Sequence, residues 1–209
     1  MLIWFYAGFS LTAWVSASPA RKREGEAQVV TNCVEPDTAA LTFLRSSSDY
    51  PTEDACIYDD DSVNRVLYAY RNGHQIGSHT WSHKDLTTLS WDNIHNEMWL
   101  VERKFPTSLY HQDDDSFLPT EAFQKIVGVT PAFMRPPFGE RLNIVDKAYG
   151  NYNDLVRQAA YIRGQALALW DFDSGDSTGS TASQSEDAYE KLISKHPSNI
   201  LALNHETEG

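Results

Sequence analysis

The chain has 209 residues, of which 41% are hydrophobic and 22% charged, a composition typical of one globular domain with a full core. Its formal net charge is −12 and its pI is near 4.9. Such a chain lacks the basic face that neutralises phosphate groups, so we expect no nucleic-acid partner.

The N-terminal segment is apolar and uncharged from residue 2 to residue 15, and small residues follow it up to Ala17 and beyond. This pattern predicts a signal peptide that is cut after Ala17; the alternative interpretation is a buried N-terminal strand. The run is too short to span a bilayer, and no later stretch is long enough for a transmembrane segment. The expected division is a signal peptide, a linker and one domain, over residues 1–17, 18–30 and 31–209.

The redox state expected for the two cysteines depends on this prediction of secretion. Secretion to the extracellular space or a cell wall would place Cys33 and Cys56 in an oxidising compartment, where they could pair. The sequence leaves that pairing open. Neither cysteine has the spacing of a metal site.

From about residue 60 onward, apolar strands alternate with amphipathic helices. The first helix is capped by Asp61 or Ser62 and stops at Gly73, and a strand over residues 75–78 follows it. The later helices are expected to begin at Ser90, Thr120, Asn153 and Ser183 or Ser185, and the later strands to cover residues 132–134, 166–170 and 200–203.

This alternation predicts an α/β fold with a parallel sheet buried on both faces. In such folds the active site lies at the carboxyl ends of the strands. Any one of the polar residues at these ends could be an ordinary surface or capping residue, but together they predict a site. The residues are His79, His83, Arg135, Asp171, Asp173, Asp176 and His205.

His79 and His83 are the most informative of these residues. A spacing of four residues puts both imidazoles on one side of a helical turn, close enough to bind one metal ion.

Four segments in chain order give the sequence a resemblance to a known family. They are Ser-His-Thr-Trp-Ser-His over residues 78–83, Arg-Pro-Pro-Phe-Gly over 135–139, Asp-Ser-Gly-Asp over 173–176 and Leu-Ala-Leu-Asn-His-Glu over 201–206. With these segments the chain resembles the polysaccharide deacetylases, the NodB-like carbohydrate esterase family four, and most closely the fungal chitin deacetylases.

The resemblance implies a distorted (β/α) barrel and a metal-dependent hydrolase that removes N-acetyl groups from chitin or related N-acetylglucosamine polymers. A divalent ion, zinc first and cobalt second, would be held by His79 and His83 and would activate water. His205 would protonate the departing amine with the support of Asp173, and Arg135 would orient the general base.

The resemblance also implies two substrate contacts. The backbone N–H near Phe138, which stands where the family usually has Tyr, would help bind the oxyanion. Leu203 would line the pocket for the acetyl methyl group. The protein is expected to be a monomer.

The family's first motif, Thr-Phe-Asp-Asp-Gly, is missing. The matching strand continues as Thr42-Phe43-Leu44-Arg45-Ser46, so the general base and the third metal ligand are both absent. Other acids, at Asp49, Glu53, Asp54 and Asp59 to Asp61, could replace them, although the last three are better explained as helix-capping residues.

The chain is also shorter than the family pattern. One βα unit is expected to be missing after Phe43, and two stretches, residues 104–119 and 140–150, look inserted. The chain stops four residues after His205, where the family continues with a helix. The barrel is therefore expected to be incomplete. Our hypothesis for these differences is a chain altered at exon boundaries, with one piece lost, two gained and the end cut short. The alternative explanation is natural loop variation, which fits the insertions but not a lost strand.

Three hypotheses remain open. The protein is a metal-dependent deacetylase of N-acetylglucosamine polymers, chitin above all, an inactive deacetylase-like secreted protein that at most binds glycan or metal, or a structural or interaction protein of the same fold with no site function. The missing motif favours the second hypothesis, and the ordered motifs leave little room for the third.

Overall fold

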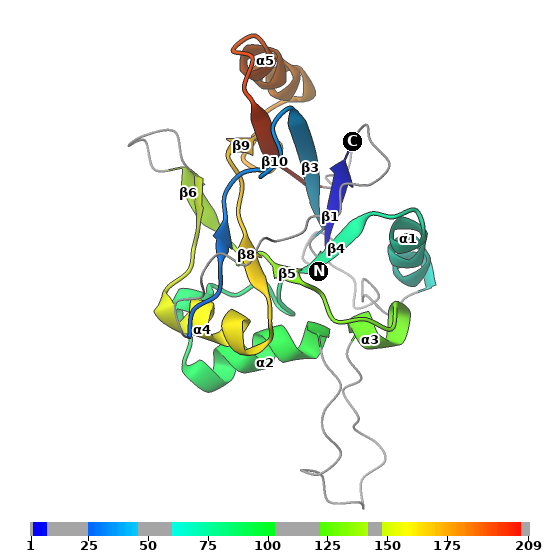
Figure 1. Ribbon diagram of the computed structural model, residues 1–209, viewed down its shortest axis with the longest axis vertical. Coiled ribbons are helices and arrows are strands. Elements are labelled where there is room, and N and C mark those ends of the chain that lie inside the picture. The colour runs from blue at the N-terminus through cyan, green and yellow to red at the C-terminus, as the bar shows by residue number, and fades with distance from the viewer. Residues whose placement is uncertain (1, 8–24, 46–59, 103–121, 142–147, 206–209) are drawn as a thin grey trace, which may run out of the picture.

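The computed structural model describes residues 2–7, 25–45, 60–102, 122–141 and 148–205. Its main feature is a curled eight-stranded sheet with helices α1 to α4 packed against its outside and α5 at one end (Figure 1). The fold is therefore α/β, as the alternating sequence pattern predicts.

The strand order in this sheet is β2-β8-β5-β4-β1-β3-β10-β9. Every neighbouring pair is parallel except the two pairs that β1 makes. The strands are β1 (Leu2–Ala7), β2 (Val29–Val30), β3 (Thr38–Arg45), β4 (Gln75–Ser78), β5 (Phe133–Met134), β8 (Ala166–Ala168), β9 (Phe172–Asp173) and β10 (Asn199–His205).

The run of residues 166–173 brings the two ends of the sheet together. Its first part, β8, pairs with β5, and its last part, β9, pairs with β10. Between them, the Asp171 backbone N–H donates to the Leu201 carbonyl at 3.0 Å. The sheet thus curls into a barrel whose strand pairing is interrupted between β8 and β9, which agrees with the predicted distorted, incomplete barrel.

Strand β1 lies between β3 and β4 and runs antiparallel to both. Its register pairs Trp4 with Phe43 on one side and with Ile76 on the other. The structure thus contains the N-terminal strand that was the alternative interpretation of this segment. Ala17 and the rest of residues 8–24 lie outside the described residues, so the signal peptide, linker and domain boundaries stay predictions.

Three apolar clusters hold these elements together. One packs α2 (Trp91–Glu102) and α4 (Asp154–Ile162) against β5 and β8, and a second packs α1 (Asp60–Arg71) and α3 (Ala122–Ile126) against β4. The third consists of Leu169, Trp170 and Leu203, where residues 166–173 meet β10. Removal of these side chains from water is the main force that places the helices on the strands.

The helix starts agree with the sequence analysis at α2 and α4 but not at α1 and α5. Helix α1 already includes Asp60, so Asp61 and Ser62 lie inside its first turn and do not cap it. Thr120 lies outside the described residues. Asn153 caps α4 by accepting the Val156 N–H, and the Ser90 side chain accepts the Asn93 N–H at the start of α2. Helix α5 (Ala182–Ile193) instead begins after Thr181, which forms a capping box with Gln184. Prediction of Ser183 or Ser185 as the cap was wrong, because the reciprocal pair formed by Thr181 and Gln184 satisfies two backbone N–H groups.

The predicted insertions and the missing unit fall largely outside the described residues. Residues 104–119 are not described, and neither are residues 46–59, where a βα unit was expected to be missing. Within residues 140–150, β6 (Gly139–Arg141) and β7 (Ala148–Gly150) form a separate two-stranded antiparallel sheet. The chain therefore leaves the barrel after β5 and returns to it at α4.

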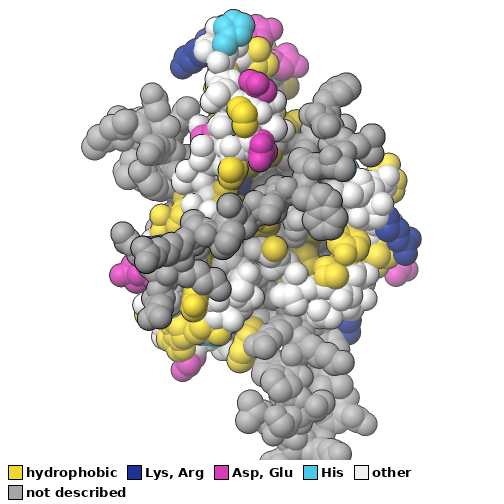
Figure 2. Space-filling model, viewed as in Figure 1, with side chains coloured by type: hydrophobic (Ala, Val, Ile, Leu, Met, Phe, Trp, Pro, Cys, Tyr) yellow, Lys and Arg dark blue, Asp and Glu magenta, His cyan; other side chains and the backbone are white. Residues whose placement is uncertain are grey.

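The surface reflects the acidic composition. Figure 2 shows acidic side chains over the end formed by α5 and at the left and lower left of this face, with lysines and arginines at the top left and on the right. None of the helices in the described part of the chain is both long and apolar enough to cross a membrane.

Candidate functional site

The strand register places the predicted site residues at one edge of the sheet. Ser78, the last residue of β4, lies opposite Met134 of β5, and Leu44 of β3 lies opposite His205 of β10. His79 and Arg135 follow directly on their strands. The carboxyl ends of these parallel strands therefore place His79, Arg135 and His205 at the same edge of the sheet.

His79 is fully oriented for binding an ion. Its ring Nδ1 lies 2.6 Å from the Arg135 carbonyl oxygen, and since a carbonyl only accepts, Nδ1 carries the proton. The lone pair therefore lies on Nε2, which is buried and has no hydrogen-bond partner. Burial lowers the pKa of His79 well below 6.5, which keeps the ring neutral. A neutral, oriented imidazole with a buried free lone pair fits a metal ligand.

His83 lies beside His79, with 5.1 Å between their ring centroids. The backbone between them is not helical, so the predicted helical turn was wrong. Thr80 and His83 instead have positive φ angles of 67° and 53°, and this loop geometry turns the His83 ring back toward the strand end. Phe138, whose φ is 60°, also packs on His83, with 4.8 Å between the two ring centroids.

Arg135 is buried in the interior of the barrel. Its guanidinium donates to the carbonyls of Ala168 and Leu169 at 2.9 and 2.8 Å and to the Thr42 hydroxyl at 2.7 Å. Burial lowers the pKa of Arg135 to about 9, partly offset by the charge of Asp173, so the side chain stays protonated at neutral pH. It thus links β3 to β8. Arg135 was expected from the sequence to orient a carboxylate base instead.

His205 pairs with Asp176, and its predicted pairing with Asp173 was wrong. Asp176 accepts from His205 twice, from Nδ1 at 2.8 Å and from the backbone N–H at 2.5 Å. The Asp173 carboxylate instead accepts the Gly175 N–H at 2.8 Å, which closes the turn after β9. Burial alone would raise the pKa of Asp176, but the hydrogen bonds and charge of His205 lower it overall.

The remaining acid at these strand ends and the two predicted substrate contacts also have definite places. Asp171 accepts the Leu201 N–H at 2.7 Å, which is a structural contact between strands. Phe138 is 53% exposed, so its ring is available to a ligand. Leu203 is 5% exposed and packs on Leu169 and Trp170 inside the barrel.

The first-motif gap is visible in the backbone. Strand β3 continues through Leu44 and Arg45, where the matching motif has its two aspartates. In the part of the chain that the structure describes, no three His, Cys, Asp or Glu side chains gather into a group that could hold a metal ion. The alternative acids Asp49, Glu53 and Asp54 lie outside the described residues.

Comparison with known proteins agrees with this arrangement. Residues 50–161 match the family described as polysaccharide deacetylase. A chitin deacetylase from Pestalotiopsis sp. is 30% identical over 149 residues, which cover 61% of this chain and 44% of that protein. This chain thus spans less than half the length of that relative. It belongs to the polysaccharide deacetylase family.

Solved structures show the same fold. The chitin deacetylase of Colletotrichum lindemuthianum superposes with a TM-score of 0.63 at 18% identity, over 86% of this chain and 78% of that one. A mutant of a family 4 carbohydrate esterase pseudoenzyme, described as having restored enzymatic activity, gives a TM-score of 0.50 at 15% identity, over 73% and 44% of the two chains.

Proposed function

We propose that this protein binds a divalent metal ion, zinc first and cobalt second, and hydrolyses N-acetyl groups of chitin or related N-acetylglucosamine polymers slowly. The observation that carries the proposal is the buried, unpartnered Nε2 of His79 beside His83, at the sheet edge that also holds His205. A relative is named chitin deacetylase, which supports this substrate class.

A metal ion at this place would acidify a water molecule and polarise the substrate carbonyl. The chain's own residues would supply the proton that the departing amine needs. His205 holds the proton for the departing amine on Nε2, because Nδ1 is engaged with Asp176. Asp176 keeps the ring oriented by accepting from Nδ1 and from the His205 backbone N–H. Asp173 supports this pair by closing the turn that positions Asp176.

Binding of the sugar is assigned to the residues around the histidine pair. The exposed Phe138 ring offers an apolar face beside His83, and its backbone N–H is proposed to bind the oxyanion. Leu203, which packs on Leu169 and Trp170, is proposed to line the pocket for the acetyl methyl group.

The rate is limited by what β3 lacks. Leu44 and Arg45 provide no carboxylate to take a proton from water or to act as a third ligand. This observation favours a second candidate function, an inactive, secreted deacetylase-like protein that binds metal or glycan only. We expect either form to act as a monomer outside the cell.

Acetate release from N-acetylglucosamine oligomers in the presence of zinc tests the proposal. The wild-type chain should release acetate slowly, and His79→Ala should abolish the release. A matched control is His74→Ala, which changes the histidine at the opposite end of the same strand. Release that is equal in wild type and His79→Ala would exclude the proposed metal site, and no release with retained zinc binding would establish the second candidate.

A further inference from the structure

Glu97 is a buried acid in the middle of α2 that holds the loop between the two histidines. Although it is only 6% exposed, its carboxylate accepts the Ser82 backbone N–H at 2.8 Å and the Ser82 hydroxyl at 2.5 Å. Its backbone carbonyl accepts the Trp81 N–H at 2.9 Å. One residue of α2 thus binds two consecutive residues of the loop that leads to His83.

This loop needs such support because its backbone is strained. Thr80 and His83 both have φ angles in the left-handed region, at 67° and 53°, which side chains with a Cβ rarely adopt. Residues of this kind persist only where the surrounding structure holds them, at a cost of about 1–3 kcal/mol each. Glu97 contacts the two residues that lie between these strained positions.

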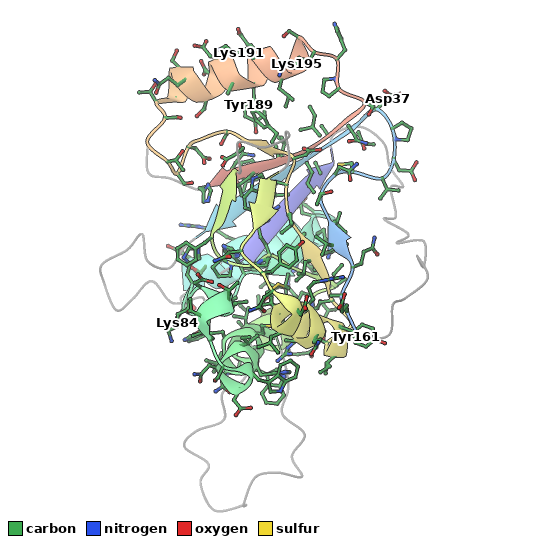
Figure 3. The ribbon with its side chains drawn as sticks, turned by 90° about the vertical axis from the view of Figure 1, so that its left-hand side faces the viewer. Asp37, Lys84, Tyr161, Tyr189, Lys191 and Lys195 are labelled. Carbon is green, nitrogen blue, oxygen red and sulfur yellow. The ribbon has the colours of Figure 1, made fainter. Side chains whose placement is uncertain are left out.

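The charge of Glu97 strengthens the contact. Burial raises its pKa, but the hydrogen bonds from Ser82 and the nearby Lys84 ammonium lower it overall, so the carboxylate is ionised at neutral pH. Hydrogen bonds to an ionised acceptor are roughly twice as strong as neutral ones. The Lys84 Nζ lies 3.1 Å from the carboxylate, but this lysine is 60% exposed on the outside of the molecule (Figure 3) and contributes little.

We infer that Glu97 is a positioning residue that sets His83 against His79 in the geometry that a metal ion needs. The inference rests on the proposed metal-binding function. Without the Glu97 carboxylate, the loop can relax out of its left-handed conformation, and the His83 ring then leaves its place 5.1 Å from the His79 ring. Metal affinity would fall even though neither histidine has been changed.

Zinc affinity of the folded protein, measured by competition with a chromophoric chelator, tests the inference. Glu97→Ala should weaken zinc binding by about 10–100-fold, the loss typical of removing a group that supports a ligand. Glu97→Gln has the same shape and keeps an acceptor for the Ser82 N–H, so it should bind zinc more tightly than Glu97→Ala. The absorption spectrum of the cobalt(II) form should change in Glu97→Ala and resemble wild type in Glu97→Gln.

Two further variants keep the experiment decisive. Asn96→Ala, at the exposed neighbouring position on α2, should bind zinc like wild type. Ser82→Ala removes one hydrogen bond at an exposed position, so it should fold and bind zinc more weakly than wild type even if Glu97→Ala does not fold. The inference is wrong, and the proposed metal site stands, if Ser82→Ala and every folded Glu97 variant bind zinc like wild type while His79→Ala loses zinc binding. Unchanged binding in His79→Ala would overturn the proposed metal site instead.

Discussion

At the residue scale, the pairing of His205 with Asp176 shows how a short turn selects the partner of a predicted site residue. Asp173 lies on β9, and its carboxylate accepts the Gly175 N–H. The turn then places Asp176 where it accepts from both the ring and the backbone of His205. The second aspartate of the Asp-Ser-Gly-Asp segment is therefore the one that supports the histidine.

Asp176→Asn should lower stability at neutral pH by about 1–2 kcal/mol, since it removes a charged hydrogen-bond acceptor. The folded-state pKa of Asp176 lies below its ordinary value of 3.8, so its contribution is present above 3.8 and is lost as the pH falls through the folded pKa. Urea unfolding at neutral and at acidic pH measures this difference. Asp187→Asn, at an exposed position on α5, is the matched control. A difference that persists unchanged into strong acid would contradict the expected role of the charge.

At the element scale, α2 carries an aromatic stripe on one face. His95 lies between Trp91 and Trp99, with ring centroids 4.2 and 5.8 Å away, and its Nε2 is buried without a hydrogen-bond partner. Burial and then the charge of Arg163 lower the pKa of His95 to about 4. The helix thus holds His95 in its neutral form between two tryptophan rings.

This stripe predicts acid sensitivity. The folded state favours neutral His95, while the unfolded chain takes up a proton below 6.5, so stability falls between pH 6.5 and about 4. The slope is at most about 1.4 kcal/mol per pH unit. His95→Phe should keep the stacking and reduce this slope in urea unfolding, whereas His196→Asn, on the exposed turn after α5, should not. An NMR titration of His95 with a midpoint near 6.5 would contradict the prediction.

The position of β1 also predicts a measurable effect. A chain that begins at Ser18, as cleavage after Ala17 would produce, lacks the strand that pairs with both β3 and β4. Its free energy of unfolding should be lower than that of the full chain by several times the roughly 0.5–1.5 kcal/mol that one hydrogen bond contributes. Urea unfolding of the two chains measures this difference.

A point substitution separates loss of the strand from loss of length. Phe5 pairs with Thr42 and with Gln75, so Phe5→Pro removes an N–H in the middle of the strand and should reproduce much of the loss. Phe5→Val keeps the backbone N–H of the strand, so its free energy of unfolding should be close to that of wild type. Equal stability of the full chain, the chain from Ser18 and Phe5→Pro would show that β1 does not support the sheet.

At the scale of the whole molecule, the sheet edge carries the predicted site histidines, while β3 has Leu44 and Arg45 where the family's first motif has its two aspartates. Replacement of Leu44 and Arg45 by two aspartates should raise acetate release by roughly 10²–10⁴-fold, the contribution of a positioned general base. The matched control places asparagine at both positions, which gives the same shape without carboxylates. If the unmodified chain already releases acetate as fast as the aspartate variant, another acid supplies the base.

The sequence alone determined the alternation of strands and helices, and with it the edge where His79, Arg135 and His205 gather. These features follow from local patterns, since apolar periodicity defines each element and parallel strands end at the same edge. The family resemblance followed from the same segments. The absence of the aspartates at Leu44 and Arg45 was equally visible in the sequence.

The tertiary structure decided what depends on contacts between distant residues. It placed β1 between β3 and β4, although an apolar N-terminal run has the same pattern as a signal peptide. It chose Asp176 over Asp173, and it brought Glu97 of α2 onto the loop before His83. No sequence signal marks Glu97, because a buried acid on a helix acquires its role only from the donors that packing brings to it.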